Sequence, residues 1–200
     1  MSAFSVIQDV SVLLRREIYD ALASAPGVTF TLSDPATNVR LEPPGDEGEA
    51  TYATLYLYQV ELDRHLRNQR NLPSRQDPSR SRRPPLTLQL RYLFTPADSL
   101  ETNNQLLLGR VLQHFHDHPL LPVPGEEPRD SHGGASVDLR VVPETPSLEQ
   151  LTQLWNALNE PFRLSVVFLV EVVAIDSGLP PQAAPRVGSF HTLVGTGEAP

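Results

Sequence analysis

Half of the chain's six histidines stand in one short stretch, QHFHDHPLL, at residues 113–121. They are His114, His116 and His118, and Asp117 lies among them. In an extended strand, alternate side chains point to the same face, so the three imidazoles would gather as they do in a three-histidine metal site. The stretch therefore raises the hypothesis of a divalent-metal-dependent enzyme, and that hypothesis depends on the local backbone.

The residues around the histidines favour a helix. Four apolar side chains follow the i, i+3, i+4, i+7 spacing of a helical stripe: Leu108, Val111, Leu112 and Phe115. At about 100° per residue, His116 would lie about 200° around such a helix from His114. Pro119 disfavours helical geometry at the residue before it. The pattern predicts the last turn of a helix, where protonated imidazoles interact favourably with the helix dipole, and it predicts no metal ligands or catalytic residues there.

A second group of residues with binding chemistry is the arginine-rich segment at residues 64–83, which also contains Pro73 and Pro78. Its arginines are Arg64, Arg67, Arg70, Arg75, Arg80, Arg82 and Arg83. We interpret the segment as a long flexible loop that docks on an acidic protein partner. A nucleic-acid arm is the alternative, because clustered arginines neutralise phosphates. Against it, the segment has no aromatic residue for base stacking, and the formal net charge of the chain is -8.

The rest of the sequence offers no further catalytic or cofactor motif. It contains no cysteine, and it has no nucleophile elbow, no phosphate-binding glycine loop and no H-E-x-x-H zinc motif. The first residues lack the basic start and apolar run of a signal peptide, and the apolar stretch LSVVFLVEVVAI is too short to span a bilayer. We therefore expect no cofactor, no membrane insertion and a cytoplasmic site of synthesis.

The periodicity along the chain predicts the elements that would position these residues. Helices are expected at 4–23, from Asp98 to Pro119, and at 147–160; Asp98 and Glu101 have capping-box spacing. Strands are expected at 28–32, 51–62, 85–94, 137–142 and 162–175. The second and third of these form a long hairpin around the arginine-rich loop. The order predicts one α+β domain at residues 1–177, with a mixed sheet of about four to five strands packed by three helices, and a tail rich in proline and glycine at residues 178–200.

The strand at 51–62 carries three tyrosines, Tyr52, Tyr56 and Tyr58. Strand alternation places them on one face, opposite Leu55 and Leu57. Tyrosine is favoured at protein interfaces, so this face is a candidate partner surface. The alternative is that the rings pack under a helix.

Four stretches in this order resemble one protein family: ATLYLYQVELDRHLRNQ, PPLTLQLRYLFTP, NNQLLLGRVLQHFHDHPLL and LTQLWNALNEPFRLSVVFLVEVVAIDS. They are similar to the N-terminal domain of the tail-terminator, or cap, proteins of extracellular contractile injection systems, which are phage-tail-like particles. The resemblance extends from Phe4 to about Ser177. Some relatives continue into a further C-terminal domain, whose functions we do not expect in this chain.

The resemblance implies a structural role rather than a reaction. A cap protein forms a ring, expected to be a hexamer, at the end of the particle far from the baseplate. It binds the inner-tube and sheath proteins, closes the tube, anchors the last sheath ring and stops polymerisation. The resemblance thus implies partners that are proteins and no nucleic acid. It also implies that the chain belongs to an injection particle, either released or kept inside the cell.

Overall fold

The computed structural model describes most of the chain, which forms two compact units. The first unit comprises Met1–Asn68 and Pro85–Asp176, and the second comprises Gln69–Pro84 and Ser177–Pro200. The described residues are 4–25, 31–45, 48, 50–63, 70–74, 77, 79–122 and 138–183, except for the side chain of Val172.

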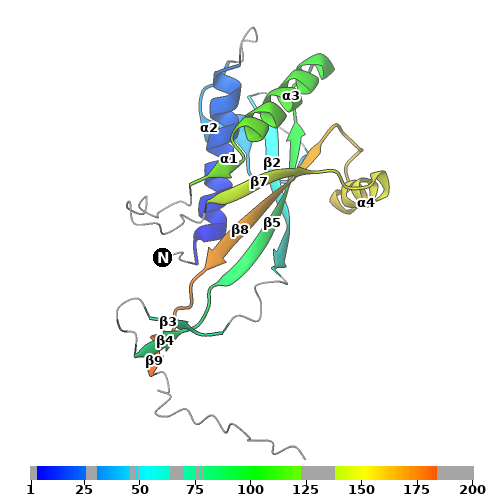
Figure 1. The fold of residues 1–200 in the computed structure, drawn as a ribbon. Helices are drawn as coiled ribbons and strands as arrows, with labels where there is room; N and C mark the ends of the chain where they lie inside the picture. Colours follow the sequence, from blue (N-terminus) through cyan, green and yellow to red (C-terminus); the bar gives the residue numbers. More distant parts are fainter. Residues whose placement is uncertain are drawn as a thin grey trace, which may run out of the picture. The chain divides into compact units, whose positions relative to one another are not determined.

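The first unit contains a mixed six-stranded sheet with the strand order β1-β2-β5-β8-β7-β6 (Figure 1). In that spatial order the strands are β1 (Val39–Arg40), β2 (Ala53–Leu62), β5 (Leu86–Pro96), β8 (Val166–Ile175), β7 (Leu139–Glu144) and β6 (Leu120–Leu121). Strand β1 is parallel to β2, and the other neighbours are antiparallel. The α+β class and the hairpin of two long strands are therefore confirmed.

Helices α1 (Val6–Ala23) and α3 (Glu101–Asp117) pack on one face of this sheet, and α4 (Leu148–Leu158) packs on the other. The main core joins the buried stripe of α1 to Val111 and Phe115 of α3 and to Leu90 and Phe94 of β5. A smaller cluster on the opposite face joins Trp155 of α4 to Leu93 and Val167. Adjacent residues of β5 thus point into different clusters, as strand alternation requires.

The sheet has more strands than expected because β1 and β6 are only two residues long and leave no periodic signal in the sequence. The expected strand at 28–32 lies mostly outside the described residues, and Thr31 and Leu32 belong to no strand. A one-turn helix, α2 (Pro35–Asn38), occupies part of a segment for which the sequence predicted neither helix nor strand. Asp34 caps it, because its Oδ2 accepts hydrogen bonds from the amides of Ala36 and Thr37.

The expected N-cap of α3, Asp98, was wrong by two residues. Leu100 is the N-cap of α3, and Asp98 instead accepts a hydrogen bond from the Leu100 amide in the turn before the helix, at 2.8 Å. Asn104 then holds this turn, since its side chain bonds the amide and the carbonyl of Asp98. The start of α4 is confirmed: Ser147 is its N-cap, and Gln150 completes a reciprocal capping box.

The second unit contains a small antiparallel sheet with the order β3-β4-β9. Its strands are β3 (Leu72–Pro73), β4 (Arg80–Arg82) and β9 (Gln182–Ala183). The first two lie in the arginine-rich segment, and the third lies in the segment that follows β8. Backbone pairing therefore joins two parts of the sequence that had both been expected to lack regular structure.

A buried tyrosine gives the first unit a predictable response to alkaline pH. The Tyr92 side chain is 0% exposed, and its hydroxyl lies 2.8 Å from Ser11 Oγ of α1. Burial raises the pKa of Tyr92 from 10.0 to about 12, although the Ser11 hydrogen bond acts the other way. Between these values the phenol ionises in the unfolded chain but not in the folded one, so the free energy of unfolding falls as pH rises.

We expect Tyr92→Phe to flatten the decline of the unfolding free energy between pH 10 and 12, measured by urea denaturation. The decline that it removes is about 3 kcal/mol, from two pKa units at about 1.4 kcal/mol each. Ser11→Ala is the matched control, because it deletes the same hydrogen bond but keeps the phenol, and it should keep the decline. The chain has no lysine, so the other side chains that titrate in this range are mainly the four remaining tyrosines, which both variants keep. An unchanged decline in Tyr92→Phe would refute the assignment.

Candidate interaction surface

The histidine cluster forms the end of α3, as the helical pattern predicted. The helix ends at Asp117 with His118 as its C-cap. His114 Nε2 lies 2.9 Å from Glu17 Oε2 of α1, so this histidine links the two helices, whereas His116 is exposed. Among the described residues, no group of three histidine, cysteine or acidic side chains is arranged to hold a metal ion.

The candidate arginines belong to the part of the sequence around the second unit. Arg64, Arg67 and Arg75 lie outside the described residues. Arg70, Arg80 and Arg83 are exposed, and Arg82 is half-buried. These described arginines belong to the second unit, whereas the candidate tyrosines belong to the first.

The three candidate tyrosines do not share one face. Tyr52 precedes the first residue of β2 and packs against the main core, so the expectation that it lies beside Tyr58 was wrong. Tyr58 packs with α4 on the opposite face, and burial raises its pKa. Tyr56 is half-buried. For Tyr58, the alternative prediction that the ring packs under a helix is therefore correct.

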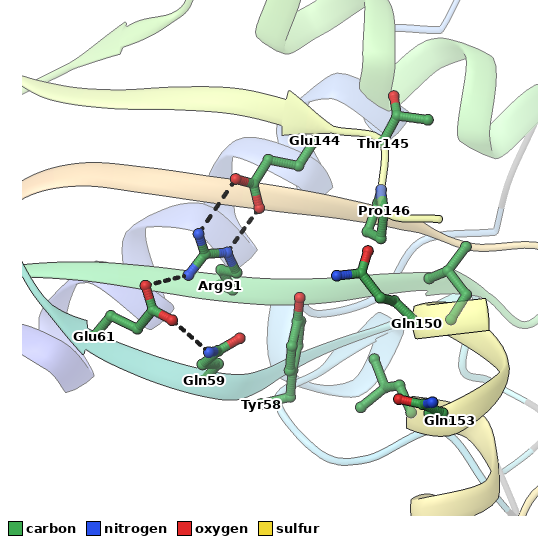
Figure 2. Close-up of a pocket in the computed structure, with 11 residues that line it drawn as sticks. Tyr58, Gln59, Glu61, Arg91, Glu144, Thr145, Pro146, Gln150 and Gln153 are labelled. Atoms are coloured by element: carbon green, nitrogen blue, oxygen red, sulfur yellow. Dashed lines mark hydrogen bonds and ion pairs between the residues drawn. The ribbon is translucent and has the colours of Figure 1, made fainter. Parts of the chain in front are cut away.

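A charged cluster that was not anticipated lies on the α4 face of the sheet (Figure 2). Arg91 of β5 extends between Glu61 of β2 and Glu144 of β7. Its Nε and Nη2 atoms donate to the two carboxylate oxygens of Glu144, at 2.8 and 3.4 Å. Its Nη1 atom forms an ion pair with Glu61 Oε2 at 2.9 Å. Gln59 Nε2 donates to the other oxygen of Glu61 at 2.7 Å, so one guanidinium connects three strands.

The environment of Arg91 makes this cluster stronger than an ordinary surface pair. The Arg91 side chain is 19% exposed, and those of Glu61 and Glu144 are 38% and 30% exposed. The hydrogen bond to Glu144 raises the pKa of Arg91 further, and Glu61 adds to the effect, whereas burial opposes it. A second charged pair, Arg140 with Glu171, joins β7 to β8 at 3.6 Å and is more open.

The charged cluster forms one wall of a pocket of about 640 Å³ between the sheet and α4. Eleven residues line it: Tyr58, Gln59, Glu61, Arg91, Glu144, Thr145, Pro146, Gln150, Leu151, Gln153 and Leu154. The Tyr58 hydroxyl and the Gln150 amide point into it (Figure 2). Two carboxylates and one guanidinium leave a formal charge of minus one. Because Arg91 holds both carboxylates, the pocket suits the docking of a polar or basic group better than proton transfer.

Comparison with known proteins places the chain in a family. The model of the Pvc16 N-terminal domain matches residues 9–189. The chain belongs to this family. The match includes both long strands of the hairpin, most of α1, all of α3 and α4, and every residue of the charged cluster. Among curated proteins, none matches the sequence. In the described part of the chain, no helix is long and apolar enough to cross a membrane.

Two solved structures share the fold of this family member. One is a PVC sheath/tube terminator of an extracellular contractile injection system, in the extended state. It has a TM-score of 0.59 and 19% identity over 98% of the present chain. The other is the tube-terminating cap of the anti-feeding prophage, with a TM-score of 0.55 and 20% identity over 92% of the chain. The chain spans 66% of the first protein and 60% of the second.

The charged cluster should contribute measurably to the stability of the fold. We expect Arg91→Gln to lower the free energy of unfolding by about 2 kcal/mol, because it leaves two half-buried carboxylates without their cation. Arg140→Gln is the matched control: it breaks a cation–carboxylate pair on the same sheet whose arginine side chain is 60% exposed. That loss should stay below about 1 kcal/mol. Urea denaturation of both variants at neutral pH tests the difference, and equal losses would contradict it.

Proposed function

We propose that this chain is the terminating cap of a contractile injection particle, a structural protein rather than an enzyme. It ends the inner tube, anchors the last ring of the sheath and stops both from growing. The observation that carries the proposal is the agreement of family and fold. The family model spans residues 9–189, and two separate terminating proteins share the fold over 98% and 92% of the chain.

The charged groups of the described residues fit a structural role. The histidine cluster closes a helix and contacts α1. The carboxylates of the pocket are held by Arg91, and Glu171 is paired with Arg140. Among these groups, only the histidines were candidates for a metal-dependent reaction from the sequence, and their contacts fit helix packing. No specific observation favours a metal-dependent reaction or nucleic-acid binding as a second function.

We further propose that the cap is a ring of six copies. A ring requires contacts in which one patch of each copy meets a different patch of the next, with a rotation that closes. The exposed arginines and the pocket of net negative charge provide unlike surfaces on the same chain. The partners are then other copies, the tube protein and the sheath protein. The chain is made and assembled in the cytoplasm and becomes part of the particle.

The proposed cap controls particle length. Deleting the protein should broaden the distribution of tube lengths or leave sheaths that shorten and detach, because nothing ends polymerisation. Negative-stain microscopy of particles from deletion and wild-type cells measures both properties. Supplying the chain again should restore them. Particles of normal length and stability in the deletion strain would refute the proposed function.

The proposed ring is tested separately by mass. Native mass spectrometry should find six copies of the chain, either alone or after addition of tube and sheath subunits that provide a template. Arg140→Gln serves as the control, since Arg140 lies outside both the pocket and the arginine-rich segment. A chain that stays monomeric in the presence of both subunits would contradict the ring, whatever the length measurements show.

A further inference from the structure

In the part of the chain that the structure describes, the outer edge of β2 lacks a partner strand along most of its length. Strand β1 pairs only with Ala53 and Thr54, whereas β5 continues along the inner edge as far as Leu62. Within the described residues, nothing forms backbone pairs with the outer edge from Leu55 to Leu62, here called the β2 edge. Unpaired backbone groups on a long edge strand are a template for another extended chain.

One face of the β2 edge is apolar and open. Val60 and Leu62 are 48% and 49% exposed, and Leu86 on the neighbouring β5 is 49% exposed. Val60 is paired with Leu90 and Leu62 with Leu88, so they lie on the face that α1 and α3 cover elsewhere. Leu88 and Leu90 are only 3% and 0% exposed. The apolar face of the sheet therefore extends beyond the part that the helices cover.

The opposite face of the β2 edge is polar and net negative. Gln59 and Glu61 alternate with Val60 and Leu62, and both line the pocket beside Arg91 and Glu144. An added strand would place every second side chain over the apolar residues and the others toward this pocket. Charge complementarity requires the latter to be basic. If a second copy paired through its own β2 edge, the Glu61 carboxylates of the two copies would instead approach each other. Like charges opposite each other on paired strands are destabilising.

We propose that the β2 edge binds an extended segment of a partner protein in which apolar and basic side chains alternate. The segment adds to the sheet as a further strand by β-augmentation. Its apolar side chains cover Val60, Leu62 and Leu86, and a basic side chain reaches Glu61 at the mouth of the pocket. The proposal concerns a binding surface and does not rest on the cap function.

Three synthetic peptides, as long as the unpaired stretch, test the proposal with the full-length chain. The first alternates arginine and valine, the second alternates glutamate and valine, and the third has the arginines and valines in separate blocks. We expect only the first peptide to bind saturably. It should also slow amide hydrogen exchange in the chain itself, in the proteolytic fragments that cover Leu55–Leu62. Its dissociation constant should be at least about tenfold lower than those of the other two, equivalent to about 1.4 kcal/mol.

Matched variants identify the surface. Glu61→Gln and Leu62→Ser should each weaken binding of the alternating basic peptide about tenfold or more. Glu101→Gln and Leu106→Ser change another exposed acid and another exposed leucine, both on α3, and should leave the affinity unchanged. Exchange protection elsewhere on the chain, or equal binding of the acidic or the blocked peptide, overturns the proposal. Protection of the β2 edge that rises with chain concentration alone would assign the edge to a second copy and overturn it too.

Discussion

The first unit depends on one constraint, which is that β5 must be paired along both edges and covered on both faces. Strand β2 pairs along one edge and β8 along the other. Residues such as Leu90 and Tyr92 require the helices α1 and α3, while Leu93 requires α4. A strand with these side chains cannot stand at the edge of a sheet or face water on one side without exposing a large apolar area. The positions of the three long helices follow from that requirement.

The charged pocket and the apolar face of the β2 edge lie where the helices no longer cover the sheet. The α4 helix shields only part of its face, and beyond it Arg91 takes the place of an apolar residue on β5 and is neutralised by its neighbours on β2 and β7. On the other face, the helices bury Leu88 but leave Leu62 and Leu86 open. A sheet that is longer than its helices therefore presents one charged surface and one apolar surface on its opposite faces, where the helices do not cover it. Such surfaces suit contacts with other proteins.

The sequence predicted the elements whose signal is long and repeated. The stripe of α3 ending at Phe115, and the apolar runs of β2, β5 and β8, are governed by local periodicity and appeared as expected, except that β8 begins at Val166 and not at residue 162. Elements of two residues, such as β1 and β6, carry no such signal. The short helix α2 did have a sequence signal, since Asp34 before Pro35 is typical of a helix start. The error at Asp98 shows that a carboxylate with capping-box spacing can serve a turn just before the helix instead.

The charged cluster could not be predicted because its members meet only through strand register. Glu61, Arg91 and Glu144 are far apart in the sequence, and β5 and β7 are not even neighbours in the sheet. The histidines show the opposite case, since they are neighbours in sequence but do not gather at one site. The rings of His114 and His118 lie 5.1 Å apart, whereas the helix directs His116 elsewhere. Spacing within a few residues therefore reports local backbone geometry, whereas a surface built from three strands depends on bulges such as the one between Leu57 and Gln59. That bulge places Tyr58, Gln59 and Glu61 around the pocket together, so a substitution that restores regular pairing there would change the whole surface at once.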